Sequence, residues 1–211
     1  MLLAGLTEVR PADRVVDLGT GCGIVPLILA YRNLGAALTG LELQEELADL
    51  ARRNVEANGF SQRVQILQMD LRQVCGHLRP ECFDLAVSNP PYRRRESGKI
   101  NPDRQRALAR HELTASVADV FSACRFLLRQ GGRLAVVYPA PRLGHLMVVA
   151  REHGFAPKDM TVIYSEPGGP ARLVHLVCYK GAGEELRIQP AFFIYDGSGA
   201  YTEAMRAMYD R

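Results

Sequence analysis

The sequence lacks paired cysteines, a long apolar segment and internal repeats. None of its five cysteines belongs to a CxxC pair, and their odd number argues against a disulfide frame or a zinc site. We therefore expect no metal and a reducing, cytoplasmic environment. The apolar residues 1–6 are interrupted by Thr7, Glu8 and Arg10 long before they reach the length of a signal peptide or a membrane span, so no targeting segment or membrane contact is expected. The cysteines are Cys22, Cys75, Cys82, Cys124 and Cys178.

Length and composition limit the number of domains. With 211 residues, 47% of them hydrophobic and 23% charged, the chain can bury one sizeable core and is short for two. We expect a single domain over residues 1–211, with residues 186–211 as a C-terminal tail packed on it, and we expect a monomer. The sequence shows no repeat or low-complexity tract that would change this expectation.

The formal net charge of +3 is unevenly distributed along the chain. Residues 93–110 hold seven Arg and Lys residues against two acidic residues, a local charge of +5, which leaves −2 for the remainder. A basic segment on a mildly acidic body is typical of a contact with a polyanion, although charge runs are more often solvated loops. The residues expected to make the contact are Arg93, Arg94, Arg95, Lys99, Arg104 and Arg106.

A glycine-rich turn follows the first predicted strand. Residues 14–18 form a short apolar run, the letters GTGCG follow, and a helical apolar pattern begins at Ile24. Glycines at alternate positions let the backbone bend sharply and approach a ligand closely. The dinucleotide fingerprint GxGxxG fits poorly, because Ile24 or Pro26 would occupy its third glycine position. The pattern is DxGxGxG instead, with Asp17 as its acidic residue.

Two further acidic residues end the next predicted strands. Glu42 follows the strand 37–41, and its two carboxylate oxygens could accept both hydroxyls of a ribose. An amphipathic helix is expected over residues 44–58, stopped by Asn58-Gly59. Asp70 follows the strand 63–67, either as a ligand-binding acceptor or as the N-cap of a weak helix that starts at Leu71.

The letters SNPPY, residues 88–92, follow the fourth predicted strand, residues 83–87. The two prolines remove two backbone donors in succession and hold Asn89 out of the helical region, so the carbonyls of this turn stay available as acceptors. The Asn89 side-chain oxygen and a neighbouring carbonyl could together accept both hydrogens of an exocyclic amino group, and Tyr92 could stack on the ring. The ordinary alternative is a structural proline turn.

The second half of the chain completes a predicted α/β sheet. We expect a helix from His111-Glu112 to Leu128, ended by Gly131-Gly132, in which His111 has a structural role. A strand over 133–138, a helix over 141–153 and strands over 161–164 and 171–179 follow. The last two strands are joined by only six residues, too few for a crossover helix, which predicts an antiparallel hairpin. The tail should end in a short helix with Thr202 as N-cap.

Taken together, DLGTGCG, LELQ, MDL and SNPPY resemble the class I S-adenosylmethionine-dependent methyltransferases that act on exocyclic amino nitrogens. The stretches NPPYRRRESGKINPDRQRALARHE and FFIYDGSGAYTEAMRAMY more narrowly resemble the bacterial tRNA (adenine-N6)-methyltransferases that modify the adenine beside the anticodon of a valine tRNA. The resemblance implies a Rossmann-like α/β fold with a seven-stranded, mostly parallel sheet, an antiparallel last strand and helices on both faces.

The same resemblance implies the site residues. S-adenosylmethionine would be bound by Asp17, Gly19, Thr20, Gly21, Gly23, Glu42, Leu43, Asp70 and Leu71, with Asn89 at the border of the cofactor. The target adenine would be held by Asn89, Pro90, Pro91 and Tyr92, and the RNA by the basic residues named above.

Members of the family usually carry a further N-terminal segment before the phrase that matches Leu2-Leu3-Ala4, and this sequence shows none.

Three alternatives stay open at this point. Methylation of a protein glutamine is the first alternative, because a primary amide offers the same two donors as adenine. Methylation of DNA would need a target-recognition domain that is not evident. A non-catalytic RNA-binding subunit with the same fold would be expected to lose Asn89 or the glycines, and both are present.

Overall fold

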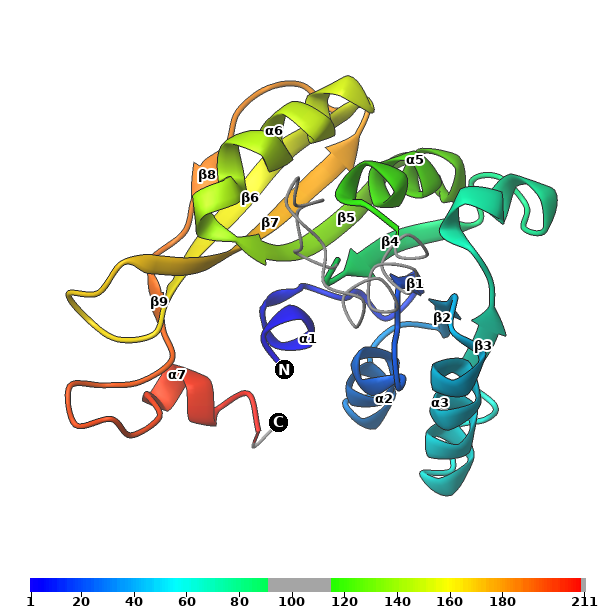
Figure 1. The fold of residues 1–211 in the computed structure, drawn as a ribbon, viewed down its shortest axis with the longest axis horizontal. Helices are drawn as coiled ribbons and strands as arrows, with labels where there is room; N and C mark the ends of the chain where they lie inside the picture. The colour runs from blue at the N-terminus through cyan, green and yellow to red at the C-terminus, as the bar shows by residue number, and fades with distance from the viewer. Residues whose placement is uncertain (91–114, 210–211) are drawn as a thin grey trace, which may run out of the picture.

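The computed structural model describes residues 1–90 and 115–209. Within these residues one nine-stranded sheet forms the centre of the molecule, in the order β3-β2-β1-β4-β5-β7-β6-β8, and β9 also pairs with β6 (Figure 1). Strands β1 to β5 are parallel to one another, and β7 is antiparallel to both of its neighbours. The longer strands are β1 Arg14–Leu18, β2 Ala37–Glu42, β3 Val64–Gln68, β4 Phe83–Ser88, β5 Leu128–Pro139, β6 Phe155–Tyr164 and β7 Ala171–Lys180.

This arrangement confirms the predicted sheet of seven strands and the predicted antiparallel hairpin between β6 and β7. Two strands of two residues each, β8 Arg187–Ile188 and β9 Phe192–Phe193, extend it at the edge. The sequence does not predict them, because two residues are too short for a periodic pattern and are fixed only by the edge of β6 that they pair with.

Helices cover both faces of the sheet, as expected (Figure 1). Alternate residues of each strand enter opposite cores, so that Val16 packs with α5 Val117–Leu127 and α6 Leu143–Glu152, while Val15 packs with α2 Ile24–Tyr31 and α3 Glu45–Ala57. The short elements are α1 Leu2–Leu6, η1 Leu71–Gly76, η2 Ala140–Arg142 and α7 Glu203–Arg206. None of the helices in the described ranges is long and apolar enough to cross a membrane.

The helix α5 ends one residue before the predicted Leu128, whereas its start and the role of the following glycines differ from the prediction. The helix begins at Val117, where Ser116 and Asp119 form a reciprocal capping box, and the expected start at His111 lies outside the described residues. Gly131 and Gly132 do not end the helix, because it stops at Leu127 and the chain enters β5 directly. The two glycines lie inside β5, where the pairing with β4 shifts register after Leu128 and Gly131 takes a φ of +71°.

Strand β6 is longer than predicted because it begins at Phe155, immediately after the turn at Gly154. This part of β6 contains Pro157, a residue unfavourable in the middle of a sheet, and the pairing with β7 shifts register between Pro157 and Asp159. Thr202 caps α7 as predicted, with its hydroxyl accepting from the Met205 N–H at 3.2 Å.

The tail returns to the start of the chain. Met205 and Met208 are buried with Ile163 and Phe192, and residues of α1 pack against the same cluster. The last described part of the tail accordingly lies beside α1. The tail is therefore attached both to the edge of the sheet through β9 and to the N-terminal helix through its methionines.

Candidate active site

The glycine turn after β1 is held by the end of β2 and by α3, and it is open beside Gly19 and Gly21. Gly19, Gly21 and Gly23 all have positive φ angles, of 79°, 58° and 83°, which residues other than glycine rarely adopt. The N–H groups of Gly19 and Thr20 both donate to the Leu41 carbonyl at 2.9 Å. A Cβ on Gly23 would lie 3.1 Å from the Ala51 Cβ, whereas a Cβ on Gly19 or Gly21 would have nothing within 4 Å. The open side of the turn can therefore receive a ligand.

Asp17 lies buried under this turn with an unsatisfied oxygen. Its side chain is only 3% exposed, and within the described residues neither Asp17 Oδ2 nor Thr20 Oγ1 has a hydrogen-bond partner. Burial raises the pKa of Asp17 to about 7, and the neighbouring Glu42 adds to the rise. The Thr20 hydroxyl lies near enough to oppose that rise but not in hydrogen-bond geometry. Two orphaned polar atoms at one open turn indicate a missing partner.

Glu42 connects the glycine turn to the next helix. Its Oε2 accepts from the Gly21 N–H at 2.8 Å and its Oε1 from the Gln44 N–H at 2.9 Å, and the residue is 6% exposed. Each oxygen keeps a further lone pair, since a carboxylate offers about four acceptor sites. Glu42 can therefore fix the turn and still accept hydroxyl groups from a ligand, as its predicted ribose role requires.

A hollow of about 270 Å³ lies beside these residues. It brings together two predicted site residues, Leu43 and Asp70, and it is lined by Leu43, Gln68, Met69, Asp70, Gln73 and His77. Leu71, also predicted, has its side chain in the core instead. Gln73 and His77 were not predicted from the sequence, although Asp70, Gln73 and His77 follow a spacing of three and four that places them on one face of a helical turn.

Asp70 performs the capping role that the sequence left open. Its Oδ1 accepts from the Arg72 N–H at 2.9 Å, and the Arg72 guanidinium binds both carboxylate oxygens, with Nη2 to Oδ2 at 2.6 Å. Hydrogen bonding to Arg72 lowers the pKa of Asp70. An amino group that binds Asp70 must therefore share this carboxylate with Arg72, and the cofactor role of Asp70 stays a prediction.

Ser88 places Asn89 next to the glycine turn. Its hydroxyl, fully buried, donates to the Leu18 carbonyl at 2.8 Å and so joins the carboxyl ends of β4 and β1. Asn89 follows as an exposed residue and Pro90 as a buried one. The predicted residues Pro91, Tyr92, Arg93, Arg94, Arg95, Lys99, Arg104 and Arg106 lie outside the described residues.

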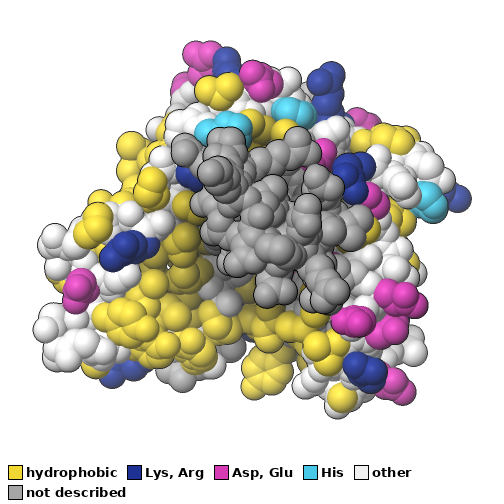
Figure 2. All heavy atoms as spheres, viewed as in Figure 1, with side chains coloured by type: hydrophobic (Ala, Val, Ile, Leu, Met, Phe, Trp, Pro, Cys, Tyr) yellow, Lys and Arg dark blue, Asp and Glu magenta, His cyan; other side chains and the backbone are white. Residues whose placement is uncertain are grey.

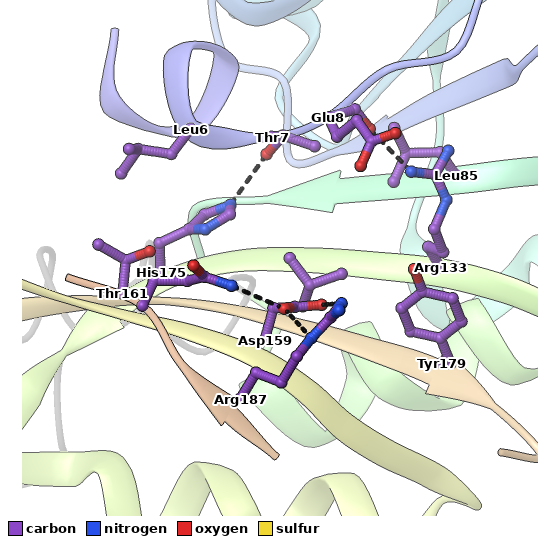
Figure 3. A pocket seen from close by; sticks show the side chains of 12 residues that line it. Leu6, Thr7, Glu8, Leu85, Arg133, Asp159, Thr161, His175, Tyr179 and Arg187 are labelled. Atoms are coloured by element: carbon purple, nitrogen blue, oxygen red, sulfur yellow. Dashed lines mark hydrogen bonds and ion pairs between the residues drawn. The ribbon is translucent and has the colours of Figure 1, made fainter. Parts of the chain in front are cut away.

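A second hollow, of about 260 Å³, contains none of the predicted site residues (Figure 3). Its polar groups are paired with one another: His175 with the Thr7 hydroxyl at 3.0 Å, Arg133 with the Glu8 carbonyl at 2.8 Å, and Arg187 with Asp159 at 2.9 Å. Burial lowers the pKa of His175 to about 4, so this imidazole is neutral near pH 7. The contacts of His175 and Arg133 attach the N-terminal segment to the sheet, and the contact of Arg187 with Asp159 joins β8 to β6.

The residues around the glycine turn fit S-adenosylmethionine, the cofactor that the sequence motifs imply. Its ammonium group would satisfy the orphaned carboxylate of Asp17, and its ribose hydroxyls would use the remaining lone pairs of Glu42. The space beside Gly19 and Gly21 admits a close approach. Within the described ranges, no group of three or more His, Cys, Asp or Glu side chains is placed to hold a metal ion.

Comparison with known proteins agrees with this geometry. The profile of the methyltransferase small domain matches residues 1–156. A tRNA1(Val) (adenine(37)-N6)-methyltransferase of Bacteroides thetaiotaomicron is 31% identical over 214 residues, covering 99% of this chain and 87% of the relative. The protein of the same name from Aeromonas salmonicida is 30% identical, covering 96% and 83%.

Among solved structures, a predicted O-methyltransferase from Agrobacterium tumefaciens, Atu636, shares the fold with a TM-score of 0.80. It is 24% identical, and the match covers 99% of this chain and 94% of that one. The profile match over most of the chain and the close relatives agree, and the chain belongs to the methyltransferase small-domain family and, within it, to the tRNA1(Val) (adenine(37)-N6)-methyltransferases.

Proposed function

We propose that this chain transfers a methyl group from S-adenosylmethionine to the exocyclic N6 nitrogen of an adenine in tRNA, beside the anticodon. The observation that supports the proposal is the hydrogen bond from Ser88 to the Leu18 carbonyl, which holds the residue before Asn89 against the end of β1, where the glycine turn with the orphaned carboxylate of Asp17 begins. The tRNA substrate is supported by the names of the relatives. The cofactor is S-adenosylmethionine, which supplies an activated methyl group on its sulfonium.

Asn89 would act by orienting the amino group. The lone pair of an adenine amino nitrogen is delocalised into the ring, so the nitrogen is a weak nucleophile. Two acceptors, the Asn89 side-chain oxygen and a neighbouring backbone carbonyl, would hold both hydrogens and favour a pyramidal nitrogen that faces the methyl group. S-adenosylmethionine would supply the methyl group and leave as S-adenosylhomocysteine, and one amino proton would be released to water. Positioning is the main contribution, and no strong base is required.

A base beside the anticodon suits this site. The target must leave its stack to reach the turn after β4, and this costs less in a single-stranded loop than in a duplex. The basic residues 93–110, which follow directly in the sequence, would hold the phosphates around the extruded base.

The test is methyl transfer by the purified chain to unmodified tRNA, followed by mass spectrometry of the nucleosides. Wild-type protein should form N6-methyladenosine. Asn89→Ala should lower the single-turnover rate by about 100-fold or more, by analogy with the loss of one transition-state hydrogen bond. Cofactor affinity should stay within about 1 kcal/mol, since the lost interaction is with the amino group.

A matched control is Asn58→Ala, which removes an exposed amide at the end of α3 that donates to the Asn54 carbonyl. Its rate should equal that of wild type. Rapid transfer by Asn89→Ala would show that the turn is only structural. Methylation of a glutamine-containing peptide instead of tRNA would overturn the proposed substrate.

A further inference from the structure

Three tyrosines of the C-terminal tail form an exposed stacked column. The ring centroids of Tyr195 and Tyr201 are 5.2 Å apart and those of Tyr201 and Tyr209 are 5.9 Å apart, with interplanar angles of 17° and 21°. The three residues are 38%, 38% and 51% exposed. On the face in view, Figure 2 shows hydrophobic side chains gathered over the region where Figure 1 shows the tail and α1. The column is an aromatic surface that the fold leaves open to solvent.

The backbone around the column is firmly held. Tyr195 and Tyr201 face each other across an antiparallel bridge, and Asp196 closes the turn between them by accepting from the Ser198 and Ala200 N–H groups at 2.8 and 3.1 Å. Thr202 donates through its hydroxyl to the Phe193 carbonyl at 2.7 Å. The Tyr209 N–H donates to the Arg206 carbonyl at 2.8 Å. The rings are thus pre-ordered, which lowers the entropic cost of binding a partner.

Packing of the tail does not explain the column. The tail is anchored by Met205 and Met208, which are 5% and 7% exposed and pack against Ile163 and α1. The tyrosines stack on one another instead, and the outer face of Tyr209 ends the column. An aromatic residue that is half exposed at the end of an ordered stack is placed to continue that stack with another ring.

The column lies at the same edge of the sheet as Asn89. Strand β6 is parallel to β4, because β5 and β6 are both antiparallel to β7, and β9 is parallel to β6. The chain therefore leaves β9 at the carboxyl edge, and the Tyr195 N–H donates to the Ser165 carbonyl just past the end of β6 at 2.8 Å. Four strand spacings separate β4 from β9, about 19 Å.

Two arginines lie between Asn89 and the column at this edge. Arg172 is exposed at the start of β7, between residues paired with the ends of β5 and β6. Arg142 follows β5, with its guanidinium carbon 5.3 Å from the centre of the Tyr138 ring. A single strand alternates phosphates and bases. Two arginines between a site for an extruded base and an aromatic column could therefore bind the phosphates that connect the two bases.

From this arrangement we infer that the tyrosine column Tyr195–Tyr201–Tyr209 stacks an unpaired base of the RNA substrate, a neighbour of the adenine that enters the site at Asn89. The inference rests on the proposed function for its substrate and adds a second recognition site, which would accept any base because every base has an aromatic face. It would favour a target in a single-stranded loop over one in a duplex.

The experiment replaces Tyr209 by Phe, Leu and Ala and measures tRNA affinity and methyl transfer. Phe keeps the ring and should remain within about twofold of wild type, whereas Leu and Ala should both lose about 5- to 150-fold in affinity, the range for one base stacked on an aromatic ring. If the ring only packs the tail, Leu should behave like Phe, because it retains the apolar volume. Single-turnover rates at saturating tRNA should change little, since the contact is made in the ground state.

A second readout identifies the stacked base. tRNA carrying 2-aminopurine at positions that flank the target adenine should lose fluorescence on binding to the wild type and to Tyr209→Phe, but not to Tyr209→Leu. Tyr31→Leu, an equally drastic change of a tyrosine that is 75% exposed on α2, serves as the control and should have no effect. Normal methylation with unchanged affinity in Tyr209→Ala would overturn the column while leaving the proposed function intact. Absence of methylation by the wild type would overturn the proposed function itself.

Discussion

At the scale of single residues, Asp17 is the most informative group in the site. Its pKa is raised to about 7 by burial, so the folded chain without ligand binds a proton that the unfolded chain releases near its ordinary value of 3.8. Stability of the ligand-free protein should therefore fall as pH rises from about 4 to about 7 and stay low above it. A ligand that brings a positive charge to Asp17 should favour the ionised carboxylate over the protonated one, because it binds the ionised form.

We predict from this that cofactor affinity increases with pH. Below pH 7 the ligand must displace a proton from Asp17, so affinity should rise by up to about tenfold per pH unit between pH 5 and 6.5 and level off near pH 7. Calorimetric titration with S-adenosylmethionine in buffers of different ionisation enthalpy measures both the affinity and the released proton.

Asp17→Asn provides the matched control for this titration, because it keeps the shape of the side chain and cannot ionise. Its affinity should be lower at pH 7 and independent of pH over the same interval. A wild-type affinity that is flat between pH 5 and 7 would show that the ligand does not meet Asp17.

Some residues of the candidate site could be predicted from the sequence and others could not. Asp17, Glu42 and Asn89 could be proposed as site residues because each lies at or next to the carboxyl end of a strand with a clear apolar pattern, and parallel strands bring these ends to one edge. Ser88 and the lining residues Gln73 and His77 were missed, because their roles depend on a hydrogen bond across 70 residues and on the course of η1. The unsatisfied state of Asp17 Oδ2 is likewise a property of packing that no local pattern carries.

At the scale of elements, different glycines of the glycine turn should affect ligand binding and folding stability. Gly19 and Gly23 both have φ near 80°, but only Gly23 lies against a neighbour, the Cβ of Ala51. Gly19→Ala should cost about 1–2 kcal/mol of stability through its left-handed backbone alone. Gly23→Ala should cost about 1–3 kcal/mol more, because the added methyl group also crowds α3.

For cofactor affinity the order of the two variants should reverse, with Gly19→Ala losing more than Gly23→Ala. A methyl group on Gly19 would project into the open space beside the turn, where the ligand would lie. Affinity for S-adenosylmethionine should therefore fall by about tenfold or more, and tenfold corresponds to about 1.4 kcal/mol. Denaturant unfolding of the ligand-free variants and calorimetry with S-adenosylmethionine give the two quantities. Full affinity in Gly19→Ala would place the ligand elsewhere.

Elements in the first half of the chain were predicted closely, since each strand there is followed by a clear turn or helix signal. The errors cluster around β5 and β6. Gly131-Gly132 has the composition of a helix stop, yet the pairing of Leu128 with Phe83 extends the strand past it. Pro157 argues against a strand, yet the register shift in β6 accommodates it. In both places strand pairing outweighs local preference, and such pairing is invisible in a single sequence.

At the scale of the whole molecule, the N-terminal segment and the tail are both tied to the sheet. Thr7 contacts His175, and Arg133 binds both the Glu8 carbonyl and the buried Asp13 carboxylate. The tail adds β9 at one edge and places Met208 against α1. These contacts support the proposal that residues 1–211 fold as a single domain. Its two main cores follow from the apolar strands, whereas the attachment of the tail could not be predicted from its single apolar run.

The distribution of charge over the whole chain leads to the last prediction. Residues 93–110 carry +5 on a body of −2, and their contact with RNA is a proposal from the sequence, because they lie outside the described residues. Replacing Arg93, Arg94 and Arg95 by Ala should weaken tRNA binding and flatten its dependence on salt, because each lost phosphate contact removes released counterions. The slope of log affinity against log salt should become shallower by about 2 to 3, at about 0.7 to 0.9 per contact.

The control removes the same charge from the opposite edge of the sheet. Arg53, Arg79 and Arg125 are exposed on α3, after η1 and on α5, where the chain returns toward the amino ends of the strands. Changing these three to Ala lowers the net charge equally, so a general electrostatic attraction would respond to both triple variants alike. A local phosphate contact requires that only the variant of Arg93, Arg94 and Arg95 changes the slope. Tyr209→Ala should lower affinity with the slope intact, because its ring is uncharged, and equal slopes in all three variants would place the RNA on another face of the molecule.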